Sequence, residues 1–246
     1  MILPKRIDRT ALHSLHTERF ADLPFDCGEE LEPGIADTDE WRDWSAMPST
    51  PDQLRIESYL DRFDLGGRAI LHIGSGNSLL AERFAGRAER IVGTTVVPGE
   101  VLRGEALGLA NYRILLHNKY GGAAELAGEW FDFIVDNNPT IFCCCLSHFA
   151  RLIEFYANAL ESDGQMVTDR VGLGWTMKGA NPRWGFSFED LAAVARLAGL
   201  GTFSHGRETI VVARVPPAQP TLGSQARRAL RRIRRAFERL WRARSS

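Results

Sequence analysis

The sequence contains no apolar run that approaches the ~20 residues of a membrane-spanning helix. Residues 1–10 are charged and lack the apolar core of a secretory signal, so we do not expect export. Only four cysteines are present, and three of them are consecutive at 143–145. So few cysteines exclude a disulfide framework and are typical of a reducing compartment, and we therefore expect a cytoplasmic protein.

No group of cysteine, histidine and acidic residues has the spacing of a metal site. Cys143, Cys144 and Cys145 fall at the start of a helix expected over 142–160, where consecutive side chains diverge by about 100°. Three thiolates arranged in this way cannot reach one ion. We therefore expect these cysteines to be small packing residues and the protein to bind no metal.

The formal net charge of −1 conceals an uneven distribution. Residues 219–246 contain nine arginines and one acid, which gives +8 and leaves −9 for residues 1–218. Within 224–244 the apolar residues recur at helical spacing, with arginines between them. These apolar residues are Leu230, Ile233, Phe237, Leu240 and Trp241.

A basic amphipathic helix of this kind is suited to an anionic membrane surface. We therefore expect residues 224–244 to attach the protein peripherally to the inner membrane surface. Two alternatives stay open. The apolar stripe docks on its own domain or on a second subunit of a homo-oligomer, or the arginines bind nucleic acid. The acidic remainder of the chain makes nucleic acid the least favoured partner.

Apolar segments of strand length alternate with helical patterns between residues 50 and 215. Strands are expected over 69–73, 90–95, 112–117, 131–136, 164–169, 201–205 and 209–215, and helices over 50–64, 78–85, 98–109, 142–160 and 187–198. This alternation predicts an α/β three-layer sandwich with a mostly parallel sheet. An irregular arm, 1–49, is expected before this domain, 50–215. A proline linker and the basic helix are expected after it, over 216–246.

Four polar segments directly follow apolar strands, at 74–78, 94–97, 117–120 and 136–140. In an open α/β sheet the ligand binds beyond the carboxyl ends of the strands, so these segments are the expected ligand site. The first contains two glycines, which allow positive φ and close approach of a ligand to the backbone. The segments therefore predict a nucleotide-like cofactor.

The fingerprint of a dinucleotide site is absent. It requires a third glycine, but Leu79 stands at that position, and an acid about 20 residues further on, where Thr94 stands. Instead, the segments ILHIGSGNSLLAERFA (70–85), IVGTT (91–95) and FDFIVDNNP (131–139) resemble class I S-adenosylmethionine-dependent methyltransferases, the Rossmann-like methyltransferase superfamily. The resemblance implies a seven-stranded sheet whose final strand is antiparallel, and an enzyme that transfers a methyl group from S-adenosylmethionine.

The resemblance also implies where the cofactor lies. The first turn meets its methionine part, the end of the second strand its ribose and the end of the third its adenine, while residues 136–139 border the methyl group and the acceptor. The cofactor-binding residues expected on this basis are His72, Gly74, Ser75, Gly76, Asn77, Thr94, Thr95, His117, Asn118, Asp136 and Asn137.

The sequence departs from the family pattern at several positions. His72 stands where an acid is common, and Ser78 stands in place of the third glycine. Thr94 and Thr95 occupy the end of the second strand, where a carboxylate usually binds both ribose hydroxyls. The acid nearest to this position is Glu100, within the next expected helix.

A hydroxyl acceptor requires a base that takes its proton. Asp136 and His148 are the expected catalytic residues, with His117 as a further candidate. The expected activity is O-methylation of a sugar, a glycan or a lipid-linked small molecule. An amine acceptor stays open, and so does a non-catalytic module of the same fold that acts through its basic tail.

The long segment 172–186 is expected to cover the acceptor. Trp175 and Trp184 can stack on a sugar ring, and Lys178 and Arg183 can hold an anion. Asn138 is also expected to contact the acceptor, because the resemblance implies that residues 136–139 border the methyl group and the acceptor.

Overall fold

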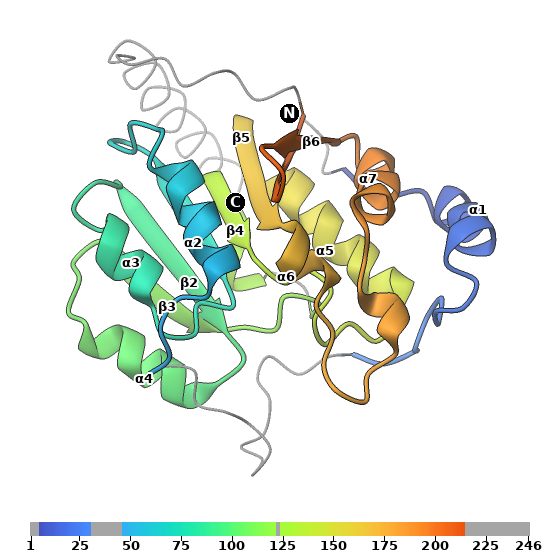
Figure 1. Ribbon diagram of the computed structural model, residues 1–246, viewed down its shortest axis with the longest axis horizontal. Coiled ribbons are helices and arrows are strands. Elements are labelled where there is room, and N and C mark those ends of the chain that lie inside the picture. The colour runs from blue at the N-terminus through green and yellow to red at the C-terminus, as the bar shows by residue number, and fades with distance from the viewer. Residues whose placement is uncertain (1–4, 31–45, 122–123, 215–246) are drawn as a thin grey trace, which may run out of the picture.

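The computed structural model describes residues 5–30, 46–121 and 124–214, which form one seven-stranded sheet with helices on both faces (Figure 1). The order across the sheet is β3-β2-β1-β4-β5-β7-β6. The strands are β1 (Ala69–Ile73), β2 (Arg90–Thr95), β3 (Tyr112–Leu116), β4 (Phe131–Asp136), β5 (Leu160–Asp169), β6 (Gly201–His205) and β7 (Thr209–Ala213).

Strands β1 to β5 run parallel, and β7 runs antiparallel to both β5 and β6. The predicted α/β sandwich with an antiparallel final strand is thereby confirmed. Strand β1 lies between β2 and β4, so the strand order reverses beside it, and ligands bind at such a point. Ile73 pairs with Thr94 on one side and with Asp136 on the other, which brings these two predicted site residues to one level.

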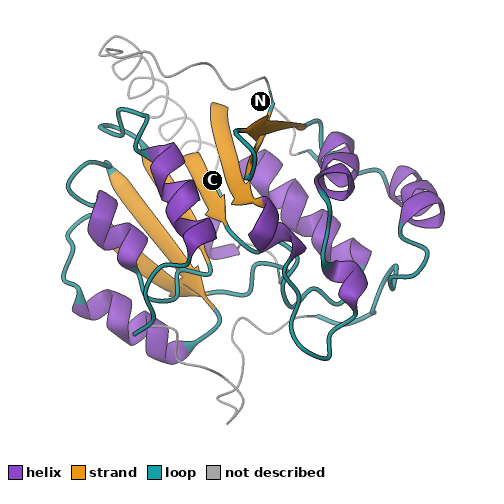
Figure 2. Ribbon diagram, viewed as in Figure 1, coloured by secondary structure: helices purple, strands orange, loops and turns teal. Residues whose placement is uncertain are grey.

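The helices cover the two faces of the sheet (Figure 2). They are α1 (Arg9–Arg19), α2 (Pro51–Leu60), α3 (Leu79–Phe84), α4 (Pro98–Ala106), α5 (Leu146–Ala159), α6 (Arg170–Gly174) and α7 (Phe188–Leu197), with 3₁₀ turns η1 (Ala124–Leu126) and η2 (Pro182–Trp184). Neighbouring residues of β1 serve different cores, because successive strand side chains point to opposite faces. Ile70 packs with α2 and α3, and Leu71 packs with the core of α1, α5 and α7.

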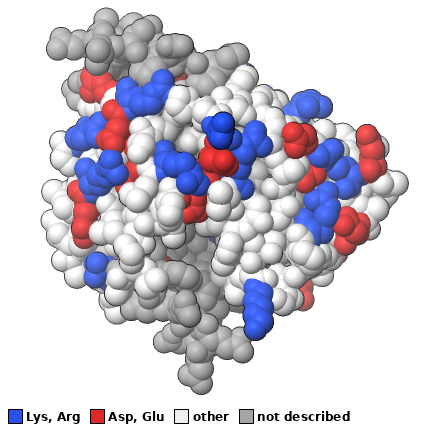
Figure 3. Space-filling model, viewed as in Figure 1, with Lys and Arg blue, Asp and Glu red and all other residues white. Residues whose placement is uncertain are grey.

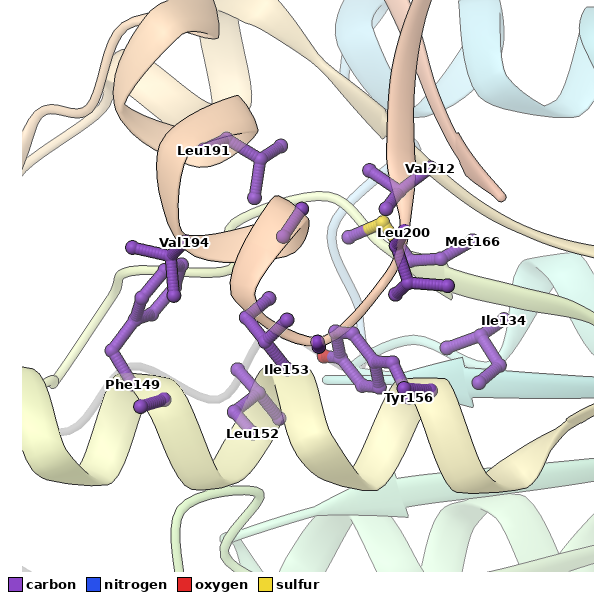
Figure 4. Close-up of a cluster of buried hydrophobic side chains, with 14 of the residues drawn as sticks. Ile134, Phe149, Leu152, Ile153, Tyr156, Met166, Leu191, Val194, Leu200 and Val212 are labelled. Carbon is purple, nitrogen blue, oxygen red and sulfur yellow. The ribbon is translucent and has the colours of Figure 1, made fainter. Parts of the chain in front are cut away.

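Helix α5 supplies much of the larger core (Figure 4). Its side chains Phe149, Ile153 and Tyr156 are fully buried and face α7 and the sheet. Leu191 of α7 and Met166 of β5 meet them there. Burying a large apolar side chain contributes roughly 1.5–3 kcal/mol, so this face fixes α5 firmly against the sheet.

The N-terminal arm is not irregular throughout, because residues 9–19 form helix α1. The carboxylate of Asp8 caps it by accepting a hydrogen bond of 2.8 Å from the backbone N–H of Ala11. The helix contributes Leu12 to the larger core, and Phe20 directly after it is completely buried. The sequence prediction missed α1 because only Leu12 and Leu15 mark its apolar side.

Other boundaries also differ from the prediction. Helix α5 begins at Leu146 rather than at 142, and β5 begins at Leu160, where the prediction still has helix. The segment 172–186 begins within α6 and includes η2, so it is partly helical. The predicted linker and basic helix over 216–246 lie outside the described residues.

One face of the described residues carries mixed charge. On the face shown in Figure 3, lysine and arginine side chains lie among aspartates and glutamates. Within the part of the chain that the structure describes, no helix combines the length and the apolar character needed to cross a bilayer.

Candidate functional site

The turn after β1 is tied to the end of β2. Gly74 and Gly76 adopt positive φ angles of 67° and 46°, which favour glycine. Between them, the backbone N–H of Ser75 donates to the Thr94 carbonyl at 2.8 Å, and the Ser75 hydroxyl donates to the same oxygen at 3.1 Å. The turn is therefore held in place by Ser75, while its two glycines leave the backbone uncovered.

The residues that complete this turn support it from within. Ser78 adopts φ 57°, the left-handed conformation that explains why glycine is common at this position. Its hydroxyl lies 2.9 Å from the Tyr112 hydroxyl. Asn77, predicted to bind cofactor, accepts a hydrogen bond of 3.1 Å from Leu79 N–H and donates to the Met47 carbonyl. Asn77 therefore holds the start of α3 and the segment before α2.

A carboxylate reaches the end of β2 from the following helix. Glu100 lies in the first turn of α4, is 3% exposed, and accepts a hydrogen bond from the Thr95 hydroxyl. Thr95 in turn accepts one of 3.1 Å from the backbone N–H of Val97, which fixes the short connection. A buried carboxylate thus lies at the end of β2, although the strand itself ends in threonine. Pro98, which favours a helix start directly after β2, is the sequence feature that indicates this placement.

The end of β3 carries a buried histidine. The backbone N–H of His117 donates to the Thr95 carbonyl at 2.7 Å, which joins the ends of β2 and β3. Burial lowers the pKa of His117 although Glu125, 3.4 Å from its Nδ1, acts in the opposite direction. Asn118 uses its side-chain oxygen to accept a 3.1 Å hydrogen bond from Tyr120 N–H. His117 is therefore a neutral ring at neutral pH.

Buried polar atoms without partners gather at this edge of the sheet. Among the described residues, Thr94 Oγ1, His117 Nε2 and Asn137 Oδ1 are buried and make no hydrogen bond. Thr94 is the second-last residue of β2, His117 directly follows β3, and Asn137 directly follows β4. Buried polar groups are nearly always satisfied in proteins, so these three atoms indicate a ligand with several donors and acceptors. His72 on β1 is also buried, and burial lowers its pKa to about 4.

Asp136, predicted as cofactor ligand and base, is engaged by protein groups. Lys119 Nζ lies 3.0 and 3.1 Å from its two oxygens, and the Tyr156 hydroxyl donates to it at 2.5 Å. Lys119 also donates to the Asn138 carbonyl at 2.6 Å. Burial lowers the pKa of Lys119, against the opposing effect of the Asp136 carboxylate. Sequence reasoning missed Lys119 and Tyr156, whose contacts with Asp136 depend on the packing of separate elements.

The two asparagines after β4 hold the loop to its neighbours. Asn137 donates to the Asp52 carboxylate at 2.6 Å, and its carbonyl accepts from Thr168 at 3.1 Å. Asn138 donates to the Gly172 carbonyl at 3.0 Å. A side chain at Gly172 would collide with Asn137, so a residue without Cβ is required there. These contacts bring the start of α6 against the loop that follows β4.

The predicted acceptor segment divides into a buried part and an exposed part. Trp184 is 7% exposed, and its ring stacks on Phe186. Arg183 pairs with Asp190 at 3.1 Å and with Asp22 at 3.4 Å. Trp175 is 45% exposed, and Lys178 is exposed as well. Only Trp175 and Lys178 are therefore free to meet an acceptor, while Trp184 and Arg183 serve the fold.

His148, the second predicted catalytic residue, lies among cysteines. Its Nδ1 is 3.1 Å from the sulfurs of Cys144 and Cys145 and 3.4 Å from that of Cys27. His148 and Asp136 therefore have different partners, since Asp136 contacts Lys119 and Tyr156. The helix assumed for the cysteine run begins only at Leu146, so the divergence of helical side chains does not apply to these residues.

Comparisons with known proteins identify the fold. No protein-family model and no curated protein matches the sequence. The solved structure of the sugar N-methyltransferase KedS8 from Streptoalloteichus sp ATCC 53650 is similar with a TM-score of 0.52 and 12% identity, over 74% of this chain and 99% of that one. The N-methyltransferase NodS from Bradyrhizobium japonicum WM9, in complex with S-adenosyl-L-homocysteine, gives 0.50 and 17%, over 72% and 91%. The chain therefore has the fold of the class I methyltransferases.

Proposed function

We propose that this protein is an S-adenosylmethionine-dependent methyltransferase. The observation that carries the proposal is the set of unpartnered buried atoms among the described residues at the carboxyl ends of β2, β3 and β4, namely Thr94 Oγ1, His117 Nε2 and Asn137 Oδ1. They border the glycine turn in a fold whose similar structures include NodS, solved with S-adenosyl-L-homocysteine. A ligand with an amino acid part, a ribose and a base matches such a row of polar atoms.

The residues present suit this cofactor part by part. A Cβ built at Gly74 meets no atom of the described residues within 4 Å, which leaves room for the methionine part. The Glu100 carboxylate and the Thr94 hydroxyl are the groups for the ribose hydroxyls. His117 and Asn118 are the groups for the adenine. The bound cofactor would supply the electrophilic methyl group, and the protein would place the acceptor in line with it.

For the acceptor we propose a sugar-containing molecule. Phe142, Trp175 and Met177 lie on the loops that follow β4 and β5 and stay 46%, 45% and 41% exposed. Large exposed apolar side chains near a ligand site are a surface on which a sugar ring can stack. Lys178 adds a positive charge to this rim.

The attacked atom we propose is an amine rather than the hydroxyl expected from the sequence. Two of the three candidate bases are engaged, Asp136 by Lys119 and Tyr156, and His148 by cysteines. The third candidate, His117, is assigned above to the adenine. A neutral amine attacks through its own lone pair and needs no buried base, whereas a hydroxyl needs one. KedS8, by its name, acts on a sugar nitrogen.

Calorimetric titration of the full chain with S-adenosyl-L-homocysteine tests the cofactor. We expect binding, and we expect Glu100→Gln to weaken it about 10- to 100-fold, since hydrogen bonds to charged groups contribute about 1.5–3 kcal/mol. Glu105→Gln is the matched control, because Glu105 lies exposed on the same helix. If the unmodified chain does not bind S-adenosyl-L-homocysteine at millimolar concentration, the proposed enzymatic function is excluded. The alternative would then be a non-catalytic module of this fold.

Transfer of a labelled methyl group to paired acceptors tests the attacked atom. Amino sugars are compared with the sugars that carry a hydroxyl at the same carbon. Labelling of the amino sugars alone supports the proposal, and labelling of the hydroxyl sugars would contradict it. An acceptor without any sugar, if methylated faster than both, would contradict the wider acceptor class.

We also propose that residues 224–244 bring the enzyme to the inner membrane surface. The support is the sequence alone, with nine arginines in 219–246 around an apolar stripe. An enzyme held there would act on acceptors that are linked to lipid.

A further inference from the structure

Three thiols and one imidazole form a cluster beside the first turn of α5. Cys27 comes from the segment after α1, Cys144 and Cys145 from the loop before α5, and His148 from α5 itself. The Sγ atoms of the cysteines and a ring nitrogen of the histidine all lie within 4.8 Å of one another. These four residues are hereafter called the Cys₃His cluster.

The separations within the Cys₃His cluster are those of a tetrahedral metal site. The sulfur pairs Cys27–Cys144, Cys27–Cys145 and Cys144–Cys145 are 3.4, 3.7 and 3.9 Å apart. His148 Nδ1 is 3.1, 3.1 and 3.4 Å from the sulfurs. Tetrahedral zinc, with Zn–S near 2.3 Å and Zn–N near 2.0–2.1 Å, requires about 3.8 Å between sulfurs and about 3.6 Å between sulfur and nitrogen. All six separations agree to within about 0.5 Å.

The backbone explains how neighbouring cysteines reach one point. Cys145 is extended, with φ −156° and ψ 160°, and precedes the helix as its N-cap. Successive side chains of an extended chain need not follow the fixed rotation of a helix. His148 lies in the first turn of α5, which returns its ring toward the same point.

Cys27 is placed by main-chain contacts with α5. The N–H groups of Leu146 and Ser147 donate to the carbonyls of Pro24 and Phe25, each at 2.9 Å. The Ser147 hydroxyl donates to the Phe25 carbonyl at 2.7 Å. The segment that carries Cys27 therefore satisfies the free N–H groups at the start of the helix. Three thiolates around Zn²⁺ carry one net negative charge, which this end of the helix dipole favours.

A disulfide does not account for the cluster. It would bring two sulfurs to about 2.05 Å and leave the third apart, whereas the three separations are similar and much longer. Hydrogen bonds among thiols are weak and do not by themselves favour four groups around one centre. A single ion at that centre accounts for all six separations together.

We propose that Cys27, Cys144, Cys145 and His148 bind one zinc ion. With four protein ligands the site is closed, so its role is structural rather than catalytic. It fastens the segment after α1 to the start of α5, directly beyond the loop of Asn137 and Asn138. Cys27 and Cys144 are partly exposed, which gives the ion a path of entry.

Metal analysis of the purified full chain is the first test. We expect one zinc per chain by mass spectrometry of the elements. Cys27→Ser and His148→Gln should each lose most of it. Cys143→Ser is the matched control, because this thiol adjoins the run but donates to the Cys145 carbonyl instead. Retention of zinc by Cys27→Ser, or its loss from Cys143→Ser, would overturn the assignment.

Spectroscopy on the unmodified chain makes the test independent of how the variants fold. Cobalt in place of zinc should give the intense visible bands of tetrahedral Co²⁺ and a near-ultraviolet thiolate band. Removal of zinc by a chelator should lower the melting temperature and release three additional reactive thiols. A chain that holds no zinc as isolated and gives no tetrahedral cobalt spectrum would refute the site.

Discussion

The ammonium of Lys119 lies 3.0 Å from the Asp136 carboxylate, inside the molecule at the carboxyl end of β4. The side chains are 10% and 2% exposed. The Tyr156 hydroxyl donates to the same carboxylate, and Lys119 reaches the Asn138 carbonyl as well. This buried pair therefore joins the loop after β3, the end of β4 and helix α5. Asp136 therefore holds these elements together, and its carboxylate is not free to act as a base.

Removal of one partner of the Lys119–Asp136 pair should destabilise the folded state. Lys119→Met should lower the free energy of unfolding by about 3–5 kcal/mol, because the Asp136 charge stays buried without its counterion. Urea unfolding followed by circular dichroism measures this. Adding Asp136→Asn to Lys119→Met should recover part of the loss, since the unpaired charge is then absent.

The control for this pair is Arg113→Gln. Arg113 pairs with Glu129 at the surface, where its side chain is 45% exposed, and such pairs contribute less than about 1 kcal/mol. Losses of similar size for Lys119→Met and Arg113→Gln would contradict the account of Asp136 given above.

The sheet could be predicted from the sequence because each of its central strands has a recognisable local pattern. β1, β2 and β4 are runs of apolar residues that stop at glycine, threonine or aspartate, and their bounds agree with the prediction. The glycine turn follows from the same local pattern. Parallel strands separated by helices then leave few arrangements. The fold could therefore be predicted from the sequence, and so could the edge of the sheet at which the candidate site residues meet.

Contacts between separate elements could not be predicted in this way. Glu100 reaches the end of β2 only because α4 begins close to that strand. Lys119, after β3, meets Asp136, the last residue of β4. Cys27 and Cys144 are 117 residues apart in sequence. Their meeting depends on the main-chain bonds between Pro24–Phe25 and the start of α5, which no periodicity indicates.

The two tryptophans predicted to meet the acceptor should behave differently. Trp184→Ala should lower the free energy of unfolding by about 3–5 kcal/mol, because it empties a space in the core beside Phe186. Trp175→Ala should change it by less than about 1 kcal/mol, because Trp175 is half exposed. Thermal and urea unfolding of both variants measure the difference. Once an acceptor is identified, Trp175→Ala should raise the KM for that acceptor without lowering the melting temperature. The opposite pattern would restore Trp184 to the acceptor site.

The basic tail gives a prediction that depends on the sequence alone. The full chain should sediment with vesicles of anionic lipid, and a chain that ends after Pro220 should not. Each arginine near an anionic surface contributes about 1 kcal/mol, an attraction that salt screens. Neutral phosphatidylcholine vesicles are the control for the full chain. Equal sedimentation of the full and shortened chains would refute membrane attachment through residues 224–244.

His72 should make the stability of the protein depend on pH between 7 and 5. Burial lowers its pKa to about 4 in the folded state, against about 6.5 when unfolded. The unfolded chain therefore binds the proton first as the pH falls. The free energy of unfolding should drop by about 2 kcal/mol between pH 7 and pH 5 because of this residue, and by more as pH 4 is approached.

The dependence of the unfolding free energy on pH distinguishes the titration of His72 from a general loss of packing. His72→Gln should lower stability at pH 7 but flatten the dependence on pH, because the group that titrates is gone. Ile70→Val, a packing change on the same strand that removes no titratable group, should lower stability but leave the slope as it is. Urea unfolding at pH 7, 6 and 5 gives the three slopes. If His72→Gln and the unmodified chain lose stability in parallel, the proton is taken up elsewhere, and the neutral state of His72 does not contribute to the stability of β1.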